Sequence, residues 1–177
     1  MFEFLEYMKS YLETKFANDN DLPNSFEMKV YDAYTTGHKP TKTEIQIQIM
    51  NDSEVDRYSS FDSTHISNIP LEIVVYAFQM KLDNKMVSAR EVSIRIADKV
   101  KVFLNELRES NVNDNIKRVR IITTSPALPT IDGEKSYMTA IRCEFWVANP
   151  YVVPVVPTPS QPSQQEQSEQ QIENGGE

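Results

Sequence analysis

Apolar and polar residues alternate along several stretches of the chain, which is the pattern of half-buried β-strands. The clearest stretch is 43–51, in which isoleucines alternate with glutamines. The other stretches that predict strands are 26–34, 70–80, 115–124 and 137–149. The pattern therefore predicts five strands.

The stretch 70–80 (PLEIVVYAFQM) differs from the others because it is apolar on both sides. Successive side chains of a strand point to opposite faces, so this stretch has two apolar sets. One set is Leu71, Ile73, Val75 and Ala77, and the other is Val74, Tyr76, Phe78 and Met80. Two helices readily cover one face of a sheet. We expect a helix to cover the first set and another molecule to cover the aromatic set.

Two further stretches have helical periodicity. Apolar residues recur every three or four positions along 1–16, which predicts an amphipathic helix. The stretch 88–110 predicts a longer helix that begins with a capping box, formed by Ser88 and Glu91. The apolar stripe expected to be buried is Val92, Ile96, Val100, Phe103 and Leu107, widened by Ala89, Ala97 and Leu104.

The order helix, three strands, helix, two strands predicts an α+β fold. We expect one mostly antiparallel or mixed sheet of about five strands, with both helices packed on one face, within a domain spanning 1–149. The polar connection 51–69 is longer than most loops of compact domains, so we expect it to be functional or flexible. Residues 150–177 are rich in proline and glutamine, which predicts an extended or disordered tail.

The formal net charge of the chain is −8. The tail from Pro150 onward has no Lys or Arg and contributes four of these negative charges through its glutamates. The remaining domain is nearly balanced in charge, which argues against a nucleic-acid-binding protein with a basic patch. No basic leader or membrane-spanning apolar run occurs in the sequence, so we expect a protein that folds in a reducing cytoplasm.

The sequence offers little catalytic chemistry. Cys143 is the only cysteine, and it shares strand parity with apolar residues, which favours a small buried side chain over a nucleophile. Two histidines in the whole chain make acid–base or zinc catalysis a weak hypothesis. We therefore expect a protein that is not an enzyme and that has no cofactor.

The acidic residues of the connection 51–69 are candidate metal ligands. Asp52, Glu54 and Asp56 have the spacing of the first ligands of a calcium loop. Such a loop has Gly at its sixth position and Glu at its twelfth, whereas this chain has Arg57 and Ser63 there. A metal site completed by Asp62 and His65 is also a weak hypothesis, so no metal is expected.

Two features of the last strands can be read in two ways. Lys117, Arg118 and Arg120 form a short basic strand, which is either a solvated face paired with Glu144 or a contact to a neighbouring subunit or to DNA. Trp146 lies on one face of the last strand, where it either packs on the sheet or anchors an interface, because Trp is enriched at binding hot spots.

The order of elements resembles a known family. An N-terminal amphipathic helix, TEIQIQIMN, a long polar loop and PLEIVVYAFQM before a capped helix resemble the tail terminator (tail completion) proteins of tailed bacteriophages. The stretch KRVRIITTSPALP and the final strand SYMTAIRCEFWV strengthen the resemblance. It covers 1–149, and the tail has no counterpart in it.

The resemblance implies a structural virion protein. Such proteins form a ring, usually of six subunits, that caps the tail tube, ends its polymerisation and joins the tail to the neck or head-completion protein. The ring is assembled in the host cytoplasm, becomes part of the virion and leaves a lumen through which DNA passes, with no membrane partner.

The expected roles of individual residues follow from this implication. The subunit interface is expected at Tyr76, Phe78, Met80, Met138, Arg142 and Trp146. The contact with the tube or the neck is expected at Asp56, Arg57, Tyr58, Phe61 and His65. The charges facing the lumen or a neighbouring subunit are expected at Lys117, Arg118 and Arg120.

Three alternatives stay open at this point. The chain could form another ring of the head-to-tail interface, such as a stopper or a tail tube subunit. It could be a small metal-dependent enzyme that uses the acidic residues and His65. It could also be an adaptor that displays its proline-rich tail to a partner with an aromatic groove.

Overall fold

The structure is a computed structural model, and it describes residues 2–19, 21–22, 26–31, 40–50, 57–59, 65–82, 84–109, 115–130 and 133–148. The helices are α1 (Phe2–Ala17) and α2 (Ala89–Glu109). The strands are β1 (Glu27–Tyr31), β2 (Glu44–Ile49), β3 (Arg57–Ser59), β4 (His65–Phe78), β5 (Met80–Leu82), β6 (Lys85–Val87), β7 (Ile116–Thr124), β8 (Leu128–Thr130) and β9 (Gly133–Ala148). The predicted tail 150–177 lies outside the described residues.

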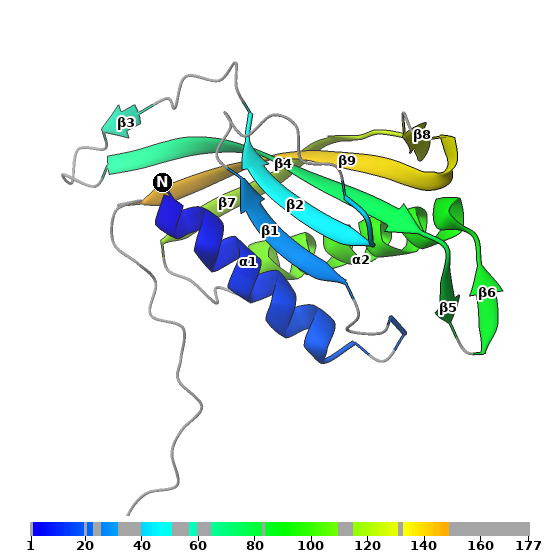
Figure 1. Cartoon of the computed structure of the whole chain (residues 1–177). Coiled ribbons are helices and arrows are strands. Elements are labelled where there is room, and N and C mark those ends of the chain that lie inside the picture. The colour runs from blue at the N-terminus through cyan, green and yellow to red at the C-terminus, as the bar shows by residue number, and fades with distance from the viewer. Residues whose placement is uncertain are drawn as a thin grey trace, which may run out of the picture.

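The main sheet has the strand order β1-β2-β4-β9-β7 (Figure 1). β1 and β2 pair in parallel, whereas β4 is antiparallel to β2 and to β9, and β7 is antiparallel to β9. The long strands β4 and β9 form the centre of the sheet. The predicted α+β fold with a mixed sheet of about five strands is confirmed.

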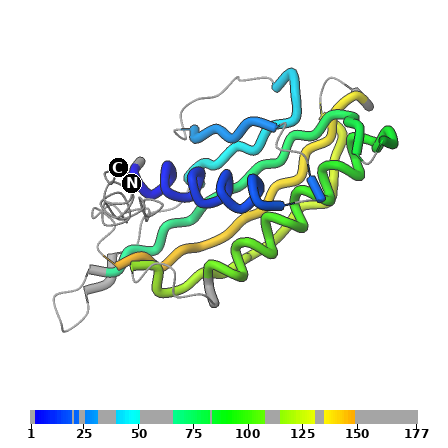
Figure 2. Tube along the Cα trace, turned by 90° about the horizontal axis from the view of Figure 1, so that it is seen from below, coloured from blue at the N-terminus to red at the C-terminus, as the bar shows by residue number. Residues whose placement is uncertain are grey.

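Both helices lie on the same side of the sheet, below it in Figure 1 and in front of it in Figure 2. α1 contacts β1 and β2, and α2 contacts β4, β9 and β7. The strand residues that face the helices are Met28, Ile45, Ile47, Leu71, Ile73, Val75, Ala77, Val119, Ile141, Cys143, Phe145 and Val147, and all are buried in one core. The prediction that the helix at 88–110 covers the Ile73 and Val75 side is confirmed.

The stripe predicted for α2 is buried throughout, from Ala89 to Leu107. The helix begins where the capping box was predicted, because the backbone N–H of Glu91 donates to the Ser88 hydroxyl at 3.3 Å. The carboxylate of Glu91 forms an ion pair with Arg95, one turn further along, at 2.6 Å. The sequence pattern therefore fixes both the start of α2 and the face that it buries.

The two helices also contact each other. The hydroxyl of Tyr11 in α1 donates a 2.8 Å hydrogen bond to the carbonyl of Phe103 in α2. Burial raises the pKa of Tyr11, and the charge of Glu106 raises it further. Lys15 forms an ion pair with Glu106 at 2.7 Å, and the ring of Phe16 packs edge-on against Phe103. These contacts hold α1 and α2 side by side under the sheet.

The connection predicted at 51–69 contains strand structure. β3 pairs with the first residues of β4, so that Arg57 lies opposite Ser67 and Ser59 lies opposite His65. β4 therefore begins five residues earlier than the predicted strand at 70–80. The alternation was hidden there because polar residues occupy both faces of HISN, and only the backbone pairing defines the strand. Residues 51–56 and 60–64 lie outside the described residues.

The predicted strand at 70–80 also ends earlier than expected. β4 stops at Phe78, and Met80 begins a separate hairpin made of β5 and β6. Asn84, at the hairpin turn, has a φ of 63°, which Asn tolerates better than most residues. A short strand, β8, likewise pairs with β9 between the predicted strands at 115–124 and 137–149. These short strands carry too few residues for a periodic signal.

Candidate assembly interface

The side of the sheet opposite α1 and α2 is called the outer face here. Its side chains form rows that run across the strands, and the register defines which residues lie next to one another. The first row is Glu27, Glu44, Tyr76, Met138 and Leu128, and the second is Lys29, Gln46, Val74 and Ala140. The third row is Tyr31, Gln48, Glu72, Arg142 and Thr123. Beyond it lie the rows Pro70, Glu144 and Arg120, then Asn68, Trp146 and Arg118, and then Ile66 and Ala148.

An apolar group lies at one end of the outer face. Tyr76 of β4 is directly opposite Met138 of β9, and Phe78 is opposite Ser136. Tyr76, Phe78 and Met138 are all partly exposed, and Leu128 at the edge is 47% exposed. Burial raises the pKa of Tyr76, and the carboxylate of Glu44 raises it further, so this phenol is neutral across the physiological range. The group offers apolar surface together with one hydroxyl.

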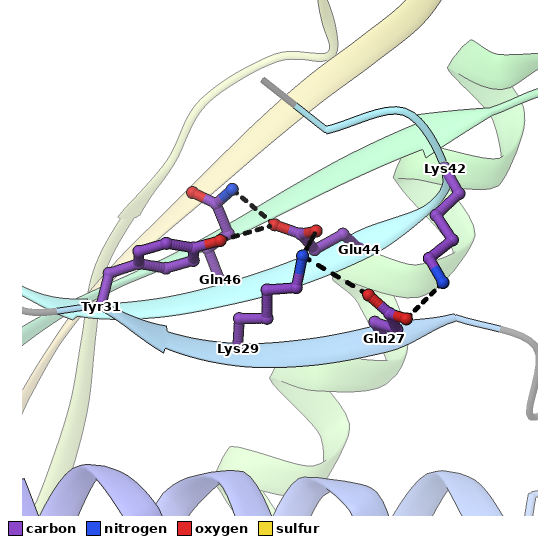
Figure 3. Close-up of polar contacts among 6 residues, drawn as sticks. All are labelled: Glu27, Lys29, Tyr31, Lys42, Glu44 and Gln46. Atoms are coloured by element: carbon purple, nitrogen blue, oxygen red, sulfur yellow. Dashed lines mark hydrogen bonds and ion pairs between the residues drawn. The ribbon is translucent and has the colours of Figure 1, made fainter. Parts of the chain in front are cut away.

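A buried carboxylate lies beside this apolar group. Glu44 is 1% exposed although it lies on the outer face. Its oxygens accept hydrogen bonds from Lys29 at 2.7 Å, from Gln46 at 2.7 Å and from Tyr31 at 3.4 Å (Figure 3). The hydrogen bond to Glu44 raises the pKa of Lys29, partly offset by burial. Because a buried charge is costly without partners, this cluster fixes the first two strands relative to each other.

The cluster continues toward the edge of the sheet. Glu27 pairs with Lys29 at 3.4 Å and with Lys42, which approaches from the start of β2 (Figure 3). The hydrogen bond from Lys42 lowers the pKa of Glu27, although this side chain is 45% exposed. Charges of both signs alternate along this edge. Such charges discourage edge-to-edge pairing of β1 with other strands.

The middle of the outer face carries a second polar group. Arg142 of β9 forms an ion pair with Glu72 of β4 at 3.0 Å, and Gln48 of β2 donates to the same carboxylate at 2.9 Å. The side chain of Arg142 is 52% exposed, so its guanidinium has donors available to solvent or to a partner. Arg142 therefore lies exposed on the outer face, and its predicted role in a subunit interface stays a prediction.

The far end of the outer face is built around Trp146. The guanidinium of Arg118 lies over the indole ring, 5.0 Å from its centroid. Asn68 lies opposite Trp146 on β4, and its side-chain oxygen is buried and accepts no hydrogen bond from the described residues. Arg120 lies opposite Glu144, the position at which cross-strand pairing was predicted. Lys117, Arg118 and Arg120 are all exposed, in agreement with a solvated basic strand.

The structure brings five of the six predicted interface residues to the outer face. Tyr76, Phe78, Met138, Arg142 and Trp146 share that face through the register of β4 and β9. The prediction that Met80 lies with them is wrong. The chain leaves the sheet at Gln79, and Met80 instead packs against the helix-covered core at the base of the hairpin.

The residues predicted to contact the tube or the neck are described only in part. Arg57 and Tyr58 lie in β3, and His65 begins β4, so these three backbone positions form a short hairpin-like extension of the sheet. Asp56 and Phe61 lie outside the described residues, as do Asp52 and Glu54 of the rejected calcium loop. Within the described ranges, no group of three or more His, Cys, Asp or Glu side chains is arranged to hold a metal ion.

Cys143 occupies the position that its parity predicted. It is fully buried in the core, where its thiol contacts the Leu71 carbonyl at 3.7 Å. Burial raises the pKa of this thiol to about 12, and the charge of Glu144 adds to the effect. The thiolate is the reactive form of cysteine, so this side chain is inert near neutral pH.

Sequence reasoning missed the Glu44 cluster. Strand parity placed Gln46 and Gln48 on the polar side of the strand, and Glu44 has the same parity. Its burial depends on Tyr76 opposite it and on Lys29 of the neighbouring strand, and these contacts follow from the register between strands. The sequence contains only one hint of this buried carboxylate, namely a glutamate at the start of a stretch of alternating isoleucines.

Comparison of the chain with protein-family models finds no matching family, and comparison with curated proteins finds no match. In the described part of the chain, no helix is both long and apolar enough to cross a membrane.

Proposed function

We propose that the chain is a structural virion protein that forms a ring, with six subunits as the expected number, at the end of a bacteriophage tail tube. The ring ends polymerisation of the tube and joins the tail to the neck or head-completion protein. The resemblance of the sequence to tail terminator proteins motivates the proposal. The order of the main helices and strands agrees with the order on which that resemblance rests.

The observation that supports the proposal most is the apolar group on the outer face. Tyr76, Phe78 and Met138 lie together and partly exposed, with Arg142 nearby on the same face. Contiguous exposed apolar side chains mark interaction surfaces, and Tyr, Met and Arg are enriched in protein interfaces. A neighbouring subunit that packs on this group would bury the partly exposed side chains of Tyr76, Phe78 and Met138.

Two other surfaces have roles in the proposed ring. The extension formed by β3 and the start of β4 projects beyond β2 and would contact the tube or the neck (Figure 1). The basic strand β7, with Lys117, Arg118 and Arg120 exposed, would face a neighbouring subunit or the DNA that passes through the lumen. Both assignments make the chain an assembly protein rather than an enzyme.

Loss of the protein during infection tests the proposal directly. Virus that lacks the gene should produce tails that are overlong or not joined to heads, and supply of the protein in trans should restore joined tails of uniform length. Tails of normal length that are joined to heads in its absence would contradict the proposal.

Two further experiments separate the alternatives. A tail tube subunit polymerises into long tubes when pure, whereas a terminator does not, and negative-stain microscopy distinguishes the two outcomes. A terminator that lacks residues 150–177 should still close tails, whereas an adaptor that displays its proline-rich segment would lose its function. A metal-dependent enzyme would require an activity that disappears, with assembly intact, when Asp52, Glu54, Asp56 and His65 are replaced by alanine.

A further inference from the structure

The end of β9 is enclosed on three sides. Its last residues pair with β4 on one side, where Ile66 lies opposite Ala148, and with β7 on the other, where Ile116 lies opposite Val147. On the helix side, the ring of Phe4 in α1 packs edge-on against Phe145, with the centroids 5.3 Å apart. The outer face around Trp146 is the direction that these described elements leave open.

At this end, the outer face presents an aromatic and cationic pair, Trp146 and Arg118. Trp146 is partly exposed and carries the Arg118 guanidinium over its ring at 5.0 Å. Beside it, the buried side-chain oxygen of Asn68 accepts no hydrogen bond from the described residues. A partly exposed indole next to an arginine is a surface that suits an extended, proline-containing segment with apolar side chains.

The sequence that follows β9 has this chemistry. The dipeptide Asn149–Pro150 favours a turn directly after the strand. It is followed by 151–157 (YVVPVVP), which combines proline-favoured extended backbone with one tyrosine and four valines. The rest of the tail has four glutamates and no basic residue, so it is complementary in charge to Arg118 and Lys117.

We propose that residues 151–157 of the same chain fold back across the outer face and pack on Trp146 and Arg118. Attachment to β9 keeps this segment at high local concentration beside the site. The assignment makes Trp146 an intrachain anchor rather than part of the subunit interface. The apolar group at Met138 remains free for a neighbouring subunit, because Met138 and Trp146 are separated by eight residues of β9, about 26 Å at roughly 3.3 Å per residue.

Trp146 is the only tryptophan of the chain, so its fluorescence reports on this contact alone. The test variant replaces Val152, Val153, Val155 and Val156 with serine in the full chain. The matched control replaces Gln164, Gln165, Gln167 and Gln170 with serine, and neither set changes the net charge. The test variant should show a red-shifted emission maximum and roughly a twofold larger acrylamide quenching constant, because the indole loses its apolar cover, whereas the control should match the wild type.

Two outcomes would overturn the proposal. Emission and quenching of the test variant identical to those of the wild type would show that the segment does not cover Trp146. If dilution of the wild-type protein increases the acrylamide quenching of Trp146, the segment that covers the indole belongs to a second copy instead. The same measurement in a Met138→Asp background separates this proposal from the proposed ring, because the intrachain contact persists there even if assembly is lost.

Discussion

The two faces of the central sheet differ in the chemistry of their side chains. On the helix side, most residues of β4 and β9 are apolar and buried in one core, and the buried hydroxyl of Thr139 pairs with that of Ser93 in α2 at 2.7 Å. On the outer face, the same two strands carry an apolar group, an ion pair of Glu72 with Arg142, and Trp146 under Arg118. The first face supplies stability, and the second offers chemically distinct positions for recognition.

The largest expected effect contrasts a core residue with a residue of the outer face. Ile73→Ala should lower the free energy of unfolding by about 2–5 kcal/mol, because it leaves a cavity among fully buried side chains. Met138→Ala on the outer face should lower it by less than about 1 kcal/mol, because its side chain is already partly exposed. Denaturant unfolding at low protein concentration measures both. If the two variants lose the same free energy of unfolding, the two faces do not differ in their contribution to stability.

The comparison also shows what periodicity can predict. The two helices and the five long strands follow from spacing alone, since each has several apolar residues at a regular interval. Strand parity also predicted correctly that Cys143 is buried and that Trp146 lies on the opposite face.

The short strands and the Glu44 cluster could not be predicted in this way. β3 consists of Arg57–Ser59, and it is defined only by its backbone pairing with β4. Met80 was misplaced because one residue outside the strand, Gln79, redirects the chain into a hairpin. The burial of Glu44 requires knowledge of its cross-strand neighbours. Parity gives the face of a residue, whereas register gives its partners.

A smaller effect is expected within the outer face itself. Glu44→Gln should lower the free energy of unfolding by about 1–3 kcal/mol, because it removes a buried charge that satisfies Lys29 and Gln46. Glu27→Gln is the matched control and should leave stability nearly unchanged, because exposed ion pairs contribute little. A Glu44 variant as stable as its control would show that the cluster has no structural role.

The smallest effect is expected where α2 meets the end of α1. Asp19 forms an ion pair with Lys99 at 2.8 Å. Burial would raise the pKa of this carboxyl, but hydrogen bonds from Lys99 and from the Asp21 backbone outweigh it and lower the pKa. A lowered pKa in the folded state means that the stabilisation is present above the ordinary value of 3.8 and is lost as the pH falls through the folded-state pKa.

Asp19→Asn should therefore be less stable than the wild type at pH 7 by roughly 0.5–1 kcal/mol, with the difference vanishing in acid. Thermal unfolding of both proteins between pH 2 and pH 7 provides the measurement. A difference that stays constant over this range would show that the charge of Asp19 does not contribute.

The mass distribution of the pure full-length protein tests the central claim, that the outer face is an assembly interface. Mass photometry of the wild type should show one closed species, expected at six copies of the 20.4 kDa chain. Met138→Asp should yield monomer. Val102→Asp, a matched change at a 49% exposed position of α2, should leave the assembly intact. A wild-type protein that stays monomeric at high concentration, or a Met138→Asp variant that assembles normally, would contradict the claim.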